Sequence, residues 1–313
     1  MLTGMHDKKK GVLFICIAAF FWSTSFSVTK LLLATVPPLT IGAIRFSLAA
    51  LILYALMRWR KGPARRGQDI KHSLAAGFVG IFVYFALENV GVEFATASDA
   101  TLIIASYPVI TLIGEVLFRG KRAGLAEVSG MILACVGVYL IAAYGSQSTS
   151  ALRNWGVLIL LLGGVVWATY SLLISTTASR LDPLSATCYQ TIAGAVAFTL
   201  ACPIEAHAWR TLGALDVGLL LYLCLSCSIL AFLLYNAGVK YVSSSTAVNI
   251  LNLVPLFGMV IAVVTLGERP SPIQILGGLI VVVGVYIVSA MDHKANRPLE
   301  HQQLARQSSG GLE

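Results

Sequence analysis

Long apolar runs, separated by short polar segments, dominate the pattern of hydrophobic and polar positions along the chain. A bilayer core about 30 Å thick requires roughly 20 apolar residues in a helix that crosses it. On this criterion the sequence predicts ten membrane-spanning helices, at residues 12–33, 38–57, 72–92, 97–118, 125–144, 155–178, 184–202, 214–238, 243–266 and 272–290. We therefore expect an all-α integral membrane protein.

Small and polar residues of the first half recur in the second half at a constant spacing. Asn89, Gly91, Ser98, Pro108, Gly120, Gly130, Gly137 and Tyr139 are followed 147 residues later by Asn236, Gly238, Ser245, Pro255, Gly267, Gly277, Gly284 and Tyr286. Trp22 and Pro38 recur 145 residues later as Trp167 and Pro183. Each half contains an odd number of predicted helices, so the second half would enter the membrane from the opposite side. Inverted repeats of this kind are typical of secondary transporters, which bind substrate where the repeats meet.

The repeat predicts three parts of the chain. Residues 1–147 would form a first five-helix repeat and residues 148–292 a second, inverted one, with both repeats around a central cavity. Residues 293–313 form a polar tail that we expect to be disordered, and its last residues resemble a cloning remnant.

Composition and charge agree with a membrane protein. Hydrophobic residues make up 57% of the chain, charged residues only 12%, and the mean hydropathy is +0.82. If the N-terminus is cytoplasmic, most of the 22 lysines and arginines lie in cytoplasmic segments, and the opposite loops hold only Arg153, Arg210 and Arg269. This bias predicts that both termini are cytoplasmic. The positions of the basic residues are then explained by the orientation of the protein in the membrane, and no nucleic-acid partner is expected.

The sequence lacks the motifs that several kinds of chemistry require. The nearest approach to a phosphate-binding loop, Gly114–Lys121, is one residue too long and is followed by Arg122 instead of Ser or Thr. Cys224 and Cys227 have C-x-x-C spacing but no second pair of ligands, and every cysteine lies in a predicted helix. We predict no ATPase subunit, no metal, no cofactor and no enzymatic activity.

Prolines and glycines occupy corresponding places in the two halves. Pro108 and Pro255 fall in the middle of predicted helices, where proline removes a backbone hydrogen bond and bends the helix. They are hinge candidates, and the alternative is a static kink. The pairs Gly130/Gly137 and Gly277/Gly284 recur at i, i+7, which predicts flat faces for close helix packing.

Aromatic, hydroxyl and amide side chains gather near the middle of the remaining helices. Trp22 and Trp167 lie about ten residues into their helices, and a buried indole N–H needs a partner, which a hydrated cavity would provide. The alternative for each residue is ordinary core packing or lipid contact. Our candidates for substrate binding are Trp22, Ser23, Phe82, Tyr84, Phe85, Tyr107, Trp167, Tyr170, Ser171, Phe232, Asn249 and Asn252.

Arg45 is the charged side chain that lies furthest inside a predicted helix. Burial of such a charge costs about 2.5–3.5 kcal/mol on the membrane-insertion scale. Glu88 and Glu93 lie at a similar depth and are candidate partners. We keep two interpretations of Arg45, a contact for a substrate carboxylate and a side chain that extends to the membrane interface.

On these residues the chain resembles the drug/metabolite transporter superfamily in its ten-helix EamA-type form. The paired segments of Trp22 and Trp167, the two prolines and Leu266-Gly267-Glu268-Arg269-Pro270 carry the resemblance, although the first half has Lys121 in place of the glutamate. The opening Phe20-Phe21-Trp22-Ser23-Thr24-Ser25-Phe26 and the aromatic third helix look like the bacterial aromatic amino-acid exporters (YddG-like). The resemblance implies a basket in which helices 1–4 and 6–9 surround a cavity.

The candidate residues and the resemblance together predict the function. We expect a secondary transporter that exports amino acids, aromatic and other neutral ones, by alternating access across the cytoplasmic membrane. Few cations are available to pair with a phosphate, which disfavours phosphorylated sugars. A multidrug or organic-cation exporter of the same fold is the first alternative, because cations also bind aromatic faces, and a channel-like facilitator is the second. Proton coupling and facilitated diffusion both fit the sequence.

Overall fold

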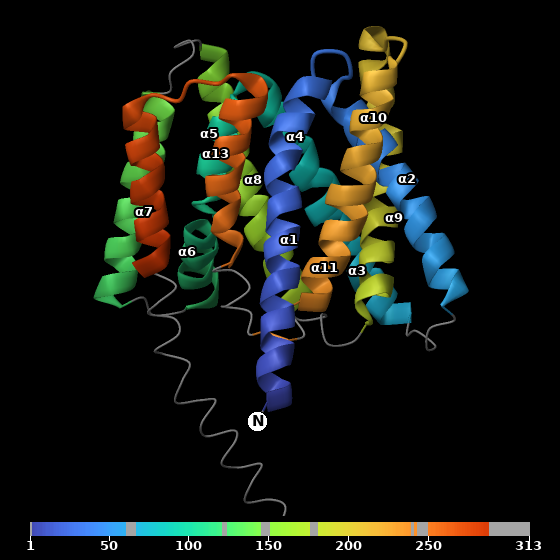
Figure 1. Cartoon of the computed structure of the whole chain (residues 1–313), viewed down its shortest axis with the longest axis horizontal. Helices are drawn as coiled ribbons and strands as arrows, with labels where there is room; N and C mark the ends of the chain where they lie inside the picture. The colour runs from blue at the N-terminus through green and yellow to red at the C-terminus, as the bar shows by residue number, and fades with distance from the viewer. Residues whose placement is uncertain are drawn as a thin grey trace, which may run out of the picture.

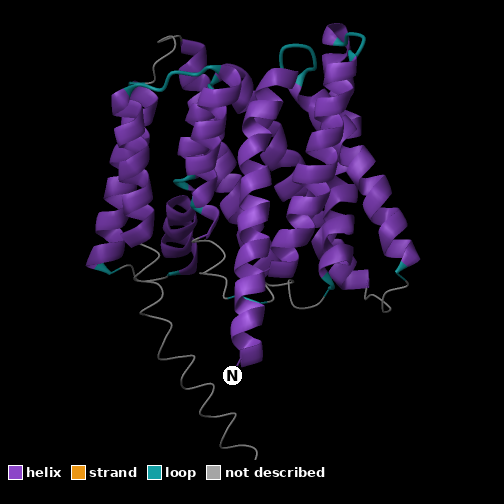
Figure 2. Cartoon of the chain, viewed as in Figure 1, coloured by secondary structure: helices purple, strands orange, loops and turns teal. Residues whose placement is uncertain are grey.

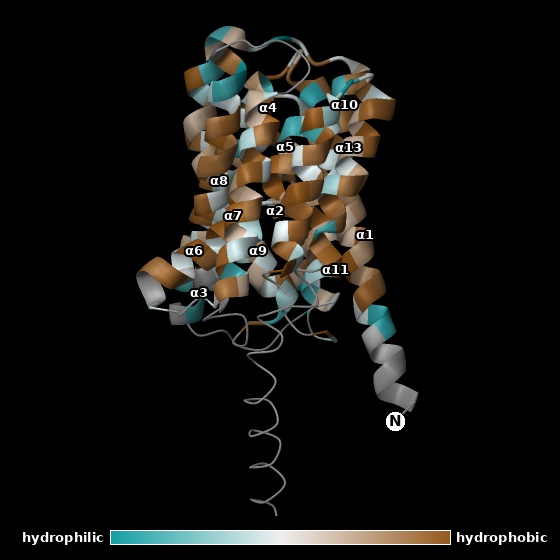
Figure 3. Cartoon of the chain, turned by 90° about the vertical axis from the view of Figure 1, so that its left-hand side faces the viewer, coloured by the Kyte–Doolittle hydropathy of each residue, from teal (hydrophilic) through white to brown (hydrophobic). Residues whose placement is uncertain are grey.

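The computed structural model describes residues 2–60, 67–120, 124–144, 151–175, 181–238, 241–242 and 250–287. Within these ranges every regular element is a helix, and the helices stand side by side as a bundle (Figures 1 and 2). Hydrophobic residues cover most of their length (Figure 3). The predicted tail at 293–313 and the candidate Asn249 lie outside the described residues.

The described residues form the following helices in chain order. They are α1 (Leu2–Leu32), α2 (Pro38–Trp59), α3 (Gly67–Gly77), η1 (Phe78–Val83), α4 (Tyr84–Phe94), α5 (Ala97–Ile104), α6 (Tyr107–Arg119), α7 (Leu125–Ala143), α8 (Ala151–Ser175), α9 (Pro183–Ala201), η2 (Cys202–Ala208), α10 (Ala214–Tyr222), η3 (Leu223–Leu230), α11 (Ala231–Gly238), α13 (Leu253–Leu266) and a final helix, Pro272–Ile287. Among the described residues, seven helices are long and apolar enough to cross a membrane. The pair α5–α6 is an eighth candidate if it is one bent span, and α13 and the final helix are shorter apolar helices.

Local sequence sets where these helices begin and end. Pro38 and Pro183 open α2 and α9, where a proline needs no N–H partner. The Asp182 carboxylate caps α9 by accepting from the Ser185 amide, and Thr96 and Asp99 form a reciprocal capping box on α5. Gly267 ends α13 with φ of 64°, the left-handed conformation that glycine adopts most easily.

Two corresponding helices each contain a π-helical segment. The segment η1 lies between α3 and α4, and η3, which begins 145 residues later, lies between α10 and α11. A π turn inserts an extra residue, is rare in proteins and frequently lies at a functional site. Hydropathy does not reveal these segments, because the apolar run continues through them.

The prolines begin helices instead of bending them midway. The predicted helix 97–118 is broken at Ala105 and Ser106, and its two pieces differ in direction by 41°. Pro108 lies in the first turn of the second piece, and Pro255 lies in the first turn of α13 after a break at Asn252. Proline is tolerated there because first-turn amides have no partner within the helix. Their action as hinges stays a prediction.

The glycine faces pack against each other. A Cβ atom added to Gly137 on α7 would lie 2.5 Å from the Gly277 carbonyl oxygen of the final helix. One added to Gly284 would lie 2.6 Å from the Gly130 carbonyl oxygen. The two helices therefore run in backbone contact at the edge of the bundle (green and red at the left of Figure 1). The predicted packing role of these glycines is confirmed.

This contact predicts opposite effects for two glycine-to-alanine variants. Gly137→Ala should lower the melting temperature in detergent, because the added methyl group overpacks a backbone contact at a cost of about 1–3 kcal/mol. Gly218→Ala on α10, where a Cβ atom would meet open space, should leave it unchanged or raise it by the better helix propensity of alanine. Equal shifts of both variants in thermal unfolding would contradict the contact.

Candidate functional site

Trp22 on α1 lies in an aromatic cluster with the helix α11. Its ring centroid is 5.2 Å from that of Phe232 and 5.3 Å from that of Tyr235. The indole N–H donates to the Cys227 carbonyl oxygen at 3.1 Å, inside the π-helical segment η3. The partner that we expected from a hydrated cavity is thus a backbone carbonyl.

Trp167 on α8 lies in a second aromatic cluster, with the helix α4. Its ring centroid is 4.9 Å from that of Tyr84 and 5.2 Å from that of Tyr170, and Tyr107 contacts Tyr84 at 6.2 Å. The Tyr170 hydroxyl donates to Gln190 Oε1 at 3.0 Å. These four predicted residues therefore come together.

The two clusters are built in the same way. Each joins the first long helix of one half of the chain to the helix that directly follows the π segment of the other half. Each also contacts the π segment itself. Trp22 bonds to a carbonyl of η3, and a Cβ atom on Gly80 of η1 would lie 2.2 Å from the ring of Tyr170. Only glycine leaves room for that ring.

Phe82 and Phe85 extend the second cluster towards α2 and α9. Phe85 contacts Phe46 with ring centroids 5.0 Å apart, and Phe82 contacts Phe198 at the same separation. Phe46 and Phe198 are stacked at 5.7 Å. Phe46 and Phe198 were not among our candidates, although both lie in predicted helices and Phe46 directly follows Arg45.

The predicted hydroxyl groups are engaged within the protein. Ser23 donates to the carbonyl oxygens of Ala19 at 2.6 Å and Val254 at 3.2 Å, which joins α1 to the start of α13. Ser171 donates to the Trp167 carbonyl one turn earlier. The Tyr107 hydroxyl donates to the Leu160 carbonyl at 2.9 Å. Asn252 precedes α13, and its side chain does not cap that helix.

Arg45 on α2 is buried, with 1% of its surface exposed. Its Nε–H donates to Ser228 Oγ at 2.5 Å, and its guanidinium carbon lies 4.9 Å from the ring centroids of both Phe46 and Phe85. The alternative in which Arg45 extends to the membrane interface is therefore wrong. Glu88, 3% exposed, lies within electrostatic range of the guanidinium and bonds through its side chain to Tyr84.

A buried ion pair joins helices at the end of the bundle away from the N-terminus, which we call the upper end (top of Figure 1). Arg153 donates to both oxygens of Asp99, at 2.6 and 2.9 Å, and also to the carbonyls of Ile141 and Ala142. The Gln274 amide donates to Asp99 at 2.6 Å. This node connects α5, α7, α8 and the final helix, so Asp99 has a structural partner.

Two more charged side chains close the upper end by capping helices. Lys30 on α1 donates to the carbonyl oxygens of Val92, Glu93 and Ala95, at 2.6–3.0 Å, in the last turn of α4 and at its C-cap. The Glu268 carboxylate accepts from the amides of Ala97 and Ser98 at the start of α5, both at 2.9 Å. Each charge complements the helix end that it contacts.

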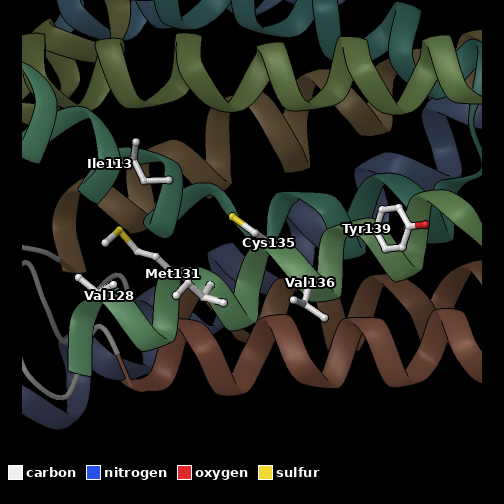
Figure 4. Close-up of a pocket in the computed structure, with 7 residues that line it drawn as sticks. Ile113, Val128, Met131, Cys135, Val136 and Tyr139 are labelled. Atoms are coloured by element: carbon white, nitrogen blue, oxygen red, sulfur yellow. The ribbon is translucent and has the colours of Figure 1, made fainter. Parts of the chain in front are cut away.

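A pocket of about 500 Å³ lies away from the aromatic clusters, between α6 and α7 (Figure 4). Ile113 of α6 and six residues of α7 line it: Val128, Met131, Ile132, Cys135, Val136 and Tyr139. None of these is a predicted site residue, and Tyr139 is 65% exposed, so the pocket opens on the outer surface. Within the described residues no group of three His, Cys, Asp or Glu side chains could hold a metal ion.

Two segments of the chain, residues 9–143 and 154–290, each match the family model described as the EamA-like transporter family. The chain belongs to this family. The two matches together cover most of the sequence, and they divide it where the spacing of repeated residues does. EamA-like transporters carry small molecules across membranes, and the relatives below are named as transporters or exporters, not as enzymes.

Relatives of this EamA-like transporter occur in archaea and bacteria. An uncharacterized transporter of Archaeoglobus fulgidus is 26% identical over 90% of this chain and 98% of its own length. The uncharacterized transporter YyaM of Bacillus subtilis is 26% identical over 87% and 91% of the two chains. The probable terminal-alkyne amino-acid exporter of Streptantibioticus cattleyicolor is also 26% identical, over 90% and 93%. A crystal structure of another protein shares the fold, with a TM-score of 0.63 and 17% identity over 92% of this chain and 99% of that one.

The buried ion pair at the upper end makes a direct stability prediction. Arg153→Gln should lower the free energy of unfolding by about 3–5 kcal/mol, because it leaves the Asp99 carboxylate buried without its guanidinium. Arg210→Gln removes an exposed arginine from a loop at the same end and should change it by less than about 0.5 kcal/mol. The melting temperatures of the two purified variants are compared by thermal unfolding. Equal melting temperatures would show that the ion pair contributes nothing to the stability of the folded protein.

Proposed function

We propose that this EamA-like transporter exports amino acids, aromatic and other neutral ones, across the cytoplasmic membrane. The observation that carries the proposal is the pair of aromatic clusters, each shared between the two halves and each next to a π-helical segment. Flat rings offer stacking and edge contacts to an aromatic or bulky apolar side chain. The name of the Streptantibioticus relative, an amino-acid exporter, supports the same substrate class.

The topology that we propose has ten spans. The bent pair α5–α6 counts as one, and α13 and the final helix complete the set. Residues 1–147 and 148–292 are then two inverted five-helix repeats, followed by a cytoplasmic tail at 293–313. The positive-inside rule places both termini in the cytoplasm and the upper end of the bundle outside the cell. The membrane is the inner membrane of a bacterium.

Alternating access requires the upper end to open and close. In the described residues this end is held by the Asp99–Arg153 node and by the Lys30 and Glu268 caps. Such a state keeps substrate from leaving to the outside. Opening would separate these contacts, and the backbone breaks just before Pro108 and Pro255 are the places where the adjoining segments can turn.

An organic-cation exporter is the second candidate function. The observation in its favour is Glu88, a buried carboxyl group bonded to Tyr84, whose ring contacts Trp167. A cation could combine that carboxylate with the aromatic faces. The two functions differ in whether the transported molecule carries a carboxylate.

Counterflow in proteoliposomes separates the two functions. Vesicles that contain purified protein and unlabelled phenylalanine receive a trace of labelled phenylalanine outside, with no ion gradient. Transient accumulation of label that excess tryptophan abolishes is the result expected of an amino-acid carrier. Accumulation of a labelled organic cation without accumulation of phenylalanine would replace our proposal by the second candidate.

The aromatic clusters predict which tryptophans matter for transport. Trp22→Ala and Trp167→Ala should each lower the phenylalanine counterflow rate roughly tenfold, since a lost apolar contact of about 1.5 kcal/mol corresponds to such a factor. Trp155→Ala changes the same residue type on α8, but Trp155 is 59% exposed, so this variant should retain the wild-type rate. Wild-type rates in both cluster variants, at normal yield of folded protein, would contradict the assignment.

A further inference from the structure

The guanidinium of Arg45 is held in place but only partly paired. Its Nε–H is bonded to Ser228, while Nη1 and Nη2 have no hydrogen-bond partner although the side chain is 1% exposed. No carboxylate among the described residues lies within ion-pair distance of it. A buried donor without a partner is costly, and more so when it is charged. Such a group in a native protein requires an explanation.

The π-helical segment η3 fixes the direction of this guanidinium. The Ser228 hydroxyl that accepts from Arg45 itself donates to the Leu223 carbonyl, five residues earlier, at 3.0 Å. The rings of Phe46 and Phe85 contact the guanidinium at 4.9 Å each. With Nε occupied, the edge formed by Nη1 and Nη2 presents two parallel N–H groups. That edge matches the two oxygens of a carboxylate.

A carboxyl group lies within electrostatic range of Arg45. Glu88 on α4 interacts electrostatically with Arg45 but forms no ion pair with it. Its side chain bonds to Tyr84, which contacts Trp167 in the α4–α8 aromatic cluster. A cation site, an anion site and an aromatic surface therefore meet in one buried region. An α-amino acid carries the matching three groups, namely a carboxylate, an ammonium group and a side chain.

We propose that Arg45 and Glu88 form the head-group site for a zwitterionic α-amino acid. Arg45 would bind the carboxylate through Nη1 and Nη2, and Glu88 the ammonium group. This assignment rests on the proposed amino-acid transport and adds to it the part of the substrate that is recognised. The second half has Gln190 at the position 145 residues after Arg45, and Gln190 accepts from the Tyr170 hydroxyl. The repeat therefore does not duplicate the site.

The test compares two probes that differ in the carboxylate. Counterflow is measured with L-phenylalanine and with phenethylamine, which keeps the ring and the ammonium group. Arg45→Gln should lower phenylalanine transport about tenfold or more, because charge-assisted hydrogen bonds are lost. It should leave any phenethylamine transport unchanged, and Glu88→Gln should lower the transport of both probes.

Three further variants control for folding and for charge. Arg58→Gln removes an exposed arginine at the other end of α2 and should transport phenylalanine at the wild-type rate. Ser228→Ala frees Nε but keeps the charge, so it should weaken phenylalanine transport less than Arg45→Gln does. Arg45→Lys keeps the charge without the paired N–H groups and remains informative if Arg45→Gln does not fold. Melting temperatures in detergent accompany every rate.

Two results would overturn the head-group site while amino-acid transport stands. One is unchanged phenylalanine transport in Arg45→Gln or Arg45→Lys. The other, for a wild type that transports both probes, is an equal loss of both in Arg45→Gln at an unchanged melting temperature, which would mark Arg45 as structural. A wild-type protein that transports phenethylamine but not phenylalanine would instead overturn the proposed function, and the carboxylate site with it.

Discussion

A bilayer core supplies no water, so each polar group within it must find a partner inside the protein. This constraint explains how the helices are joined. Trp22 binds a carbonyl of η3, Ser23 a carbonyl next to Pro255, and Tyr107 a carbonyl of α8. In each case a polar side chain of one helix satisfies the backbone of another. The Nη atoms of Arg45 depart from this rule, as do uncharged side-chain atoms of Ser27, Thr29, Asn89 and Ser98. An unpaired buried donor costs most when it is charged, and for that reason a substrate is the partner that we assign to Arg45.

The two halves share a construction but differ in chemistry, as transport of an asymmetric molecule requires. Both have a π-helical segment in the corresponding helix and an aromatic cluster beside it. A π turn misaligns the local ladder of backbone hydrogen bonds, and at η3 it leaves a carbonyl for Trp22 and a position from which Ser228 reaches Arg45. Arg45 has the neutral Gln190 as its counterpart. The repeat therefore gives the two halves the same helical framework, and in our proposal the residues that differ between them recognise the substrate.

The sequence predicted a helical membrane protein and the glycine contact between α7 and the final helix, because hydropathy and glycine spacing depend on local composition. It did not predict the π segments, since an extra residue in an apolar helix leaves no trace in hydropathy. It also missed the caps by Lys30 and Glu268, because their partners are backbone groups of distant helices and carry no side-chain signature. Arg153 was placed in a loop by the sequence, and its pairing with Asp99 was not predicted because it depends on how α5 meets α8. The transport roles of the candidate residues remain predictions.

The most direct test of the central site is a crystal structure with 4-bromo-L-phenylalanine, located by the anomalous signal of its bromine atom. If substrate binds between Arg45, Glu88 and the aromatic clusters, the bromine peak should lie beside Tyr84 and Trp167, with the carboxylate on the Nη edge of Arg45. A peak in the apolar pocket between α6 and α7, with the centre empty, would contradict the central site.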